Sequence, residues 1–151
     1  MQISKTLFTT TVTALLLTIA PQAQAQFKSD AVLLEAAMEP GAKVTDSGLV
    51  IRMLKEGKGP QPNAASTVRV HYKGTFPDGK EFDSSHKRGE PIEFLLNGVI
   101  KCWTEGVALM KVGGTAKLTC PSSIAYGARG AGGVIPPNAT LVFEVELLGV
   151  R

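Results

Sequence analysis

The sequence predicts an α+β fold, in which an antiparallel sheet wraps around one short α-helix. Residues 68–73 and 140–150 alternate apolar with polar side chains, as strands with one buried face do. Residues 101–110 repeat apolar side chains at helical spacing instead. Several strands and a single helix, separated by turns rich in glycine and proline, are typical of the α+β class. A length of 151 residues is enough for one domain with short additions.

The first 25 residues are predicted to be a secretory signal peptide. Lys5 is the only charge among them, it precedes a short apolar run, and Ala23 and Ala25 form a small-x-small cleavage site. An uncleaved membrane anchor is the weaker alternative, because the run is shorter than the roughly 20 residues that span a bilayer. No cysteine lies near the site to carry a lipid. We therefore expect a mature chain that begins at Gln26 and is periplasmic or secreted.

Residues 26–43 are predicted to be a leader in front of the main domain. Its one expected element is a short helix at residues 31–38, with Ser29 or Asp30 as the N-cap and Pro40 just beyond its end. A helix of this length is marginal by itself, so we expect it either to dock on the domain or to fray.

The main domain, residues 44–151, is expected to open with a strand at residues 49–54. In the next strand the alternate side chains from Val68 to Tyr72 face the core. His71 lies between them on the opposite face, and we interpret it as an ordinary solvent-exposed residue.

The later elements follow from turn residues and periodicity. We expect, in order, a return strand at 81–83, the helix at 101–110, a strand at 116–120, a loop at 122–138 and the last strand at 140–150. The helix should bury Trp103, Val107 and Met110 on one face. The last strand should bury Leu141, Phe143 and their alternate neighbours.

Composition and motifs exclude several functions. The net charge is +3 and its charges are scattered, without the basic stripe that nucleic-acid binding requires. Two cysteines and two histidines lack metal-ligand spacing, and the chain has no Gly-x-Ser-x-Gly motif and no phosphate-binding glycine loop. We therefore expect no metal, no cofactor and no nucleophilic mechanism.

A series of motifs covers nearly all of the main domain. They are VHYKG at 70–74, DGKEFDSS at 78–85, VIKCWTEG at 99–106, AYG at 125–127, IPPNATL at 135–141 and FEVEL at 143–147. In this order and spacing the chain resembles the FKBP-type peptidyl-prolyl cis-trans isomerases over its whole main domain. The resemblance implies an antiparallel half-barrel with the helix across its concave face and a pocket between the two.

Carried over position by position, the resemblance implies an apolar pocket with a polar edge. The residues with an expected catalytic role are Tyr72, Phe82, Asp83, Trp103, Tyr126 and Phe143. The residues expected to bind substrate are Arg88, Ile92, Val99, Ile100 and Ile135. In the family, the residue matching Trp103 is the floor under the prolyl ring. The backbone N–H matching Ile100 and the hydroxyl matching Tyr126 bind the substrate, and Asp83 would pair with Arg88 at the pocket edge.

Such a pocket suits rotation about an X–Pro bond, which breaks no covalent bond. Amide resonance sets a barrier of about 18–20 kcal/mol, so the uncatalysed rotation is slow. A catalyst must bind the twisted amide better than either planar form. The twisted amide has lost its charge separation, so an apolar pocket favours it. The resemblance therefore implies an isomerase whose partners are proline-containing polypeptides.

The residues leave alternatives open. Any single aromatic residue, such as Trp103, is more often part of the core than of a site. The same groove could hold peptides without catalysis, as in a chaperone, or the cavity could carry a small molecule. The resemblance also implies inhibition by the macrolides rapamycin and tacrolimus, and the short leader favours a monomer.

The export signal and the resemblance together imply a disulfide between Cys102 and Cys120. Exported proteins keep disulfides, and the family fold brings the start of the helix near the end of the strand at 116–120. Two buried free thiols are the alternative. The chain departs from the commonest family pattern at three positions. Ala131 stands where members often carry histidine, Ile92 stands where they often carry an aromatic residue, and Cys102 replaces a residue that is often glycine.

Overall fold

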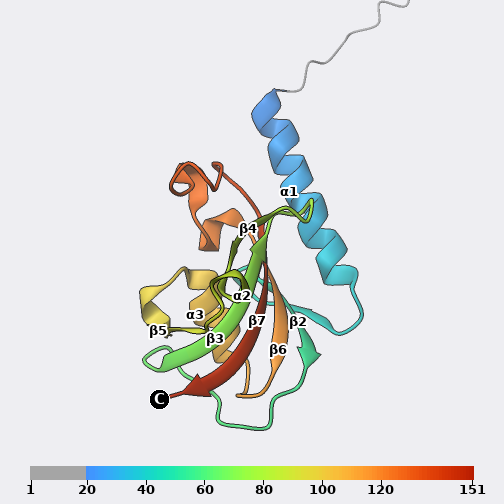
Figure 1. Ribbon diagram of the computed structural model, residues 1–151. Coiled ribbons are helices and arrows are strands. Elements are labelled where there is room, and N and C mark those ends of the chain that lie inside the picture. Colours follow the sequence, from blue (N-terminus) through green and yellow to red (C-terminus); the bar gives the residue numbers. More distant parts are fainter. Residues whose placement is uncertain (1–19) are drawn as a thin grey trace, which may run out of the picture.

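The computed structural model describes residues 20–151, which form a curved, seven-stranded antiparallel sheet around helix α3 (Lys101–Ala108) (Figure 1). The strands are β1 (Ala42–Val44), β2 (Val50–Lys55), β3 (Thr67–Thr75), β4 (Glu81–Ser84), β5 (Ile92–Leu95), β6 (Thr115–Cys120) and β7 (Leu141–Val150). Their order is β1-β2-β6-β7-β3-β4, and β5 pairs with the other half of the same edge of β3. The predicted α+β class is confirmed.

The elements predicted by periodicity are present, with ends within two residues of those expected. The sequence pattern did not predict β1, β5 or the one-turn helix α2 (Ser85–Arg88). Each of these has only three or four residues, which is too short for a periodic pattern to develop. Short 3-10 turns are also present: η1 (Leu96–Gly98), η2 (Ser122–Ile124) and η3 (Gly127–Arg129).

The leader forms a longer helix than the sequence predicted, α1 (Pro21–Met38). Its end agrees with the expected stop before Pro40. Its start does not, and the predicted N-cap at Ser29 or Asp30 is wrong, because both residues lie inside the helix. The hydroxyl of Ser29 instead forms a hydrogen bond with that of Thr140, the residue just before β7.

Most of the predicted signal peptide, residues 1–19, lies outside the described residues. No helix within residues 20–151 is long and apolar enough to cross a membrane.

Helix α1 is docked on the sheet beside β2 and β6 (Figure 1). Ala36 is buried there, and Glu39 receives Arg52 Nη1 at 2.8 Å and Lys117 Nζ at 2.5 Å. The hydrogen bond from Lys117 lowers the pKa of Glu39; burial opposes this shift, but Arg52 reinforces it. Tertiary contacts therefore hold a helix whose sequence is weakly amphipathic.

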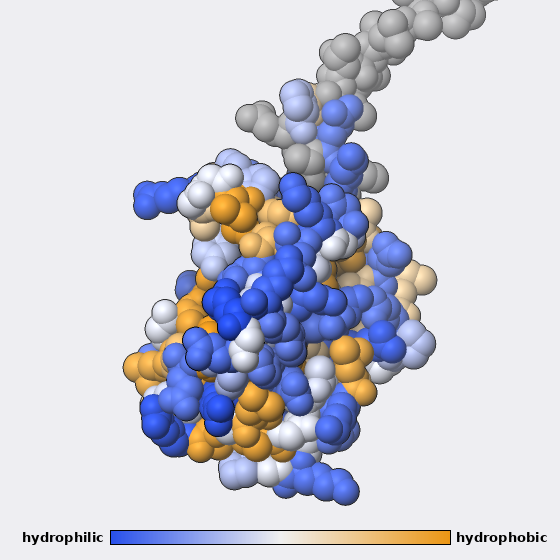
Figure 2. All heavy atoms as spheres, viewed as in Figure 1, coloured by the Kyte–Doolittle hydropathy of each residue, from blue (hydrophilic) through white to orange (hydrophobic). Residues whose placement is uncertain are grey.

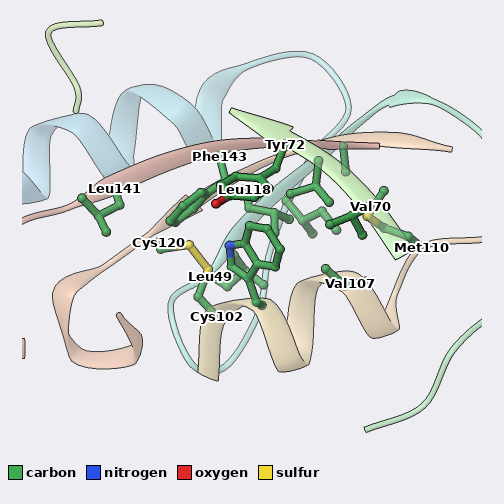
Figure 3. Close-up of a cluster of buried hydrophobic side chains, with 14 of the residues drawn as sticks. Leu49, Val70, Tyr72, Cys102, Val107, Met110, Leu118, Cys120, Leu141 and Phe143 are labelled. Carbon is green, nitrogen blue, oxygen red and sulfur yellow. A yellow bond between two sulfur atoms is a disulfide. The ribbon is translucent and has the colours of Figure 1, made fainter. Parts of the chain in front are cut away.

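The core lies between the sheet and α3 (Figure 3). Val70, Leu118 and Phe143 point inward from three different strands, and all are buried. Val107 faces them from α3 and is fully buried, as predicted. Gly106 lets the helix approach the sheet closely, because a Cβ atom there would lie 2.9 Å from the side chain of Leu118.

The outer surface is mixed in character. Figure 2 shows hydrophilic residues over much of the face that it presents, with hydrophobic residues on the loop that joins β6 to β7 and in further patches over the lower part of the domain. In that loop the side chain of Val134 is 56% exposed.

His71 is not the ordinary surface residue that the alternation predicted. It faces away from α3 as expected, but it is only partly exposed, and its Nδ1 lies 2.9 Å from the Ser85 hydroxyl. Its ring stacks on that of His86, with centroids 4.4 Å apart and an interplanar angle of 14°. The expectation of a plain exposed residue was wrong because α2, which periodicity could not predict, packs on this part of β3.

Candidate active site

A cavity of about 540 Å³ lies between α3 and the sheet. All of the site residues expected from the sequence line it, except Arg88 and Ile135, and Phe94 and Gly98 add to its wall. The lining is aromatic and aliphatic, and Asp83 is the one charged side chain in it. A mostly apolar cavity of this size with few polar groups is typical of a binding site for a small molecule or a peptide segment.

Trp103 forms the floor of this cavity. Its side chain is 5% exposed, and α3 presents it to a ring of aromatic residues. Tyr72 and Phe143 stand nearly perpendicular to it, with ring centroids at 5.1 and 5.3 Å, and Phe94 packs at 5.3 Å. Such pairs each contribute about 0.5–1.5 kcal/mol beyond area burial. The floor is therefore held in place by its neighbours.

The indole N–H of Trp103 has no partner. Within residues 20–151 it is the one buried side-chain nitrogen or oxygen atom without a hydrogen bond. Leaving a buried donor unpaired costs about 1–3 kcal/mol, and such exceptions commonly have a functional reason. This N–H is itself buried and lies near the Cys102–Cys120 disulfide (Figure 3), so it is an unpaired donor of the core behind the floor.

The wall of the cavity beside this floor is formed by Phe82 and Phe143, and their packing requires a glycine. Phe82 packs on Phe143 with centroids 5.7 Å apart and rings nearly perpendicular. Both rings lie against Gly74 of β3, where a Cβ atom would come within 2.6 Å of Phe82 and 3.0 Å of Phe143. Any larger residue at this position would displace the wall.

The polar edge is a network of three side chains. The Tyr72 hydroxyl donates to Asp83 Oδ2, Arg88 Nη2 donates to the Tyr72 hydroxyl at 2.9 Å, and Arg88 Nη1 donates to Asp83 Oδ1 at 2.6 Å. The backbone N–H of Ser84 also donates to Asp83 Oδ1, at 2.8 Å. The guanidinium lies over the Tyr72 ring as well, 5.6 Å from its centroid. Arg88 therefore contacts two residues at the edge of the cavity, but its own side chain is not part of the cavity wall.

This network sets the charges at the edge. Burial raises the pKa of the Asp83 carboxyl, but the bonds from Tyr72 and Arg88 outweigh burial and bring that pKa below its usual value. The pKa of Tyr72 is raised, mainly by burial and to a smaller extent by the hydrogen bond to Asp83. The bonds to Tyr72 and Asp83 raise the pKa of Arg88 further. At neutral pH the edge therefore holds a carboxylate, a neutral phenol and a guanidinium.

The loop between β6 and β7 contributes Tyr126, whose side chain lines the cavity and is 40% exposed. The expected pocket residue Ile135 is not in the cavity wall. Its side chain is buried as part of the hydrophobic core, and its backbone pairs with Ala131 in a short bridge within the loop. The motif placed it in the right loop, but the fold of that loop decides which side chains reach the cavity.

A disulfide joins Cys102 of α3 to Cys120 at the end of β6, with Cα atoms 5.9 Å apart (Figure 3). Both residues are fully buried. Because Cys102 immediately precedes Trp103, the bridge ties the floor of the cavity to the sheet.

A family model described as FKBP-type peptidyl-prolyl cis-trans isomerase matches residues 59–148. The chain belongs to this family. The matched segment contains every residue that lines the cavity, the disulfide and the polar edge.

Relatives support the assignment to the FKBP-type family. FkpA of Escherichia coli is 50% identical over 85% of this chain, and the match covers 51% of FkpA. FK506-binding protein 1 of Dictyostelium discoideum is 61% identical over 67% of this chain and 96% of its own length. A solved isomerase structure from Pseudomonas syringae superposes with a TM-score of 0.81 at 40% identity, over 89% of this chain and 98% of that one. The chain thus spans about half the length of FkpA.

Two lining residues of this FKBP-type domain were missed in the sequence. Phe94 follows Ile92 by two positions in β5, so the alternation of that strand would have identified it had the strand been recognised. Gly98 contributes backbone from the turn before Val99 and gives no side-chain signal. Among the residues that the structure describes, no group of three or more histidine, cysteine, aspartate or glutamate side chains could hold a metal ion.

Proposed function

We propose that this chain is a peptidyl-prolyl cis-trans isomerase that rotates X–Pro bonds in exported polypeptides. The observation that carries the proposal is the aromatic cavity, with Trp103 as its floor and a fixed polar network at its edge. An apolar cavity with a few oriented polar groups suits binding of a twisted prolyl amide.

The cavity catalyses the rotation by binding the twisted amide more tightly than the planar one. The prolyl ring packs on Trp103, between Tyr72 and the Phe82–Phe143 wall. In the planar amide, resonance gives the bond charge separation that water stabilises, whereas the twisted amide lacks it. Moving the bond into an apolar cavity therefore favours the twisted form over both planar forms, which lowers the barrier. The cavity accomplishes this without a covalent intermediate.

Two donors orient the substrate. Tyr126 keeps an accessible side chain at the cavity, so its hydroxyl can donate to the carbonyl that precedes proline. Ile100 is the N-cap of α3, and its carbonyl accepts the N–H groups of Trp103 and Thr104. These bonds anchor Ile100 at the start of the helix, and its own N–H, in the preceding peptide group, supplies the second contact to the substrate.

The edge network holds Tyr72 and supplies fixed charge. Because its pKa is lowered, Asp83 stays ionised at neutral pH and does not act as a general acid. Its part is to anchor the Tyr72 hydroxyl and, with Arg88, to keep the wall rigid. Ile92 and Val99 complete the apolar surface on which the residue before proline packs.

A peptide-binding chaperone would use the same groove without catalysis, and a small-molecule carrier would use the cavity alone. The complete set of floor, wall and edge residues favours the isomerase over both. The name of the Dictyostelium relative describes it as FK506-binding. Together with the 61% identity to that relative, the name supports binding of FK506 (tacrolimus), and of the related macrolide rapamycin, by this chain.

The sequence at residues 1–25 supports export, and we propose a periplasmic location after cleavage before Gln26. We propose that the protein acts as a monomer. Analytical ultracentrifugation and the N-terminal sequence of protein from the periplasm test these two statements.

The isomerase proposal is tested by a proline-limited assay on the purified protein. We expect faster cis-to-trans conversion of Leu-Pro and Phe-Pro peptides, and inhibition by rapamycin. A rate equal to that in buffer, from a sample shown to be folded by circular dichroism, would contradict the proposal. Peptide binding without acceleration would favour the chaperone.

A further inference from the structure

The one-turn helix α2 connects the cavity edge to the outer face of the sheet. On the cavity side, Arg88 donates to the Tyr72 hydroxyl and to Asp83. On the outer side, His86 stacks on His71, with ring centroids 4.4 Å apart. A helix of four residues is not stable by itself, so contacts such as these decide where it lies.

Ser85 joins the two sides. Its fully buried hydroxyl accepts the backbone N–H of Tyr72 at 2.8 Å and lies 2.9 Å from His71 Nδ1. His71 and Tyr72 are neighbours on β3 with side chains on opposite faces, so the path from the outer face to the cavity wall is short. Any movement of α2 therefore shifts Arg88 relative to the Tyr72 hydroxyl.

We propose that His86 is a positioning residue for the pocket: its stack on His71 holds α2, which keeps Arg88 on Tyr72 and Asp83. The inference rests on the proposed function to the extent that this cavity is the isomerase site.

The stack borders a shallow groove on the outer face of the sheet. The groove is lined by His71 and His86 together with Lys73, Thr115, Glu144 and Glu146. Glu146 lies opposite His71 in the strand register, and Glu144 is paired with Lys73 at 3.6 Å. Lys87 points elsewhere, to an ion pair with Glu81 at 2.8 Å.

The chain has one tryptophan, Trp103, whose ring contacts Tyr72. Its fluorescence therefore reports on the pocket independently of turnover.

The test compares the wild type with His86→Phe, which keeps a stacking ring that cannot be charged, and with His86→Ala, which removes the ring. Lys87→Ala is the matched control, since it removes an exposed charge from the same helix. Peptide kcat and KM, rapamycin affinity and Trp103 fluorescence are measured for each protein at neutral pH.

We expect His86→Ala to lower rapamycin affinity and kcat/KM about threefold to tenfold, as for the loss of one hydrogen bond, and to raise KM more than it lowers kcat. Its Trp103 fluorescence should change as well. His86→Phe and Lys87→Ala should both match the wild type. Wild-type KM and rapamycin affinity in a folded His86→Ala would overturn the proposal. If His86→Ala fails to fold, His86→Phe decides, because a loss of rapamycin affinity in that variant would also overturn the proposal. A wild type without turnover, with rapamycin affinity lowered in His86→Ala alone, would contradict the isomerase function and retain the positioning role.

Discussion

Tyr72 stands nearly perpendicular to Trp103, with ring centroids 5.1 Å apart, while its hydroxyl is held by Asp83 and Arg88. One side chain therefore connects the floor of the cavity to its polar edge. The contact also joins the sheet to helix α3, so the geometry of the pocket depends on how these two layers pack. The effect of a substitution should therefore depend on whether it changes the floor, the polar edge or Tyr72, which joins the two.

Tyr126→Phe should weaken rapamycin and substrate binding by about 0.5–1.5 kcal/mol, because it removes one exposed donor. The melting temperature should stay near that of the wild type, since the hydroxyl serves the ligand and not the core. Isothermal titration and thermal unfolding check both expectations. Tyr72→Phe is the matched comparison: it removes a hydroxyl bonded to two side chains and should lower stability as well as affinity. If Tyr126→Phe bound rapamycin and substrate as tightly as the wild type does, the Tyr126 hydroxyl would not be a binding group of the site.

Asp83→Ala should reduce turnover more than stability. The carboxylate side chain is 42% exposed, so its ion pair with Arg88 adds little to folding, but it anchors the Tyr72 hydroxyl at the cavity. The control is Glu81→Ala, which breaks the neighbouring ion pair with Lys87 outside the cavity. Peptide assays and urea unfolding give the comparison. Wild-type turnover per folded molecule for Asp83→Ala would show that the edge is only structural.

Reducing the Cys102–Cys120 bridge should lower the free energy of unfolding by about 3 kcal/mol, because the bridge closes a loop of 18 positions in the unfolded chain. Turnover should fall too, since Cys102 adjoins the Trp103 floor. Thermal unfolding with and without reductant measures the first effect. Thiol titration under denaturing, non-reducing conditions is the direct check, and two free thiols per chain would exclude the bridge.

The ion pairs of Glu39 should make the docking of α1 depend on pH. The pKa of Glu39 is lowered in the folded protein, so its stabilisation is present above the unfolded value near 4.5 and is lost as the pH falls through the folded value. The difference in melting temperature between wild type and Glu39→Gln should therefore be largest near neutral pH and shrink below about pH 4. Glu35→Gln, exposed on the same helix, is the control and should show no such dependence. A constant difference at all pH values would contradict this assignment.

The long periodic segments and the motif series were enough to predict the fold class and most of the cavity. In β3 and β7 the alternation identified the buried faces, and in α3 the helical spacing identified the face with Trp103 and Val107. Their local pattern and tertiary environment agree, because each of these elements buries one face along its whole length.

Only the tertiary structure decided the places of the short elements. Strand β5 brings Phe94 to the cavity, α2 covers His71, and the loop fold buries Ile135 away from the wall. Segments of three or four residues have too few positions to show a period and too little internal bonding to be stable alone. Their positions are set by the partners on which they pack, and those partners lie far away in the sequence.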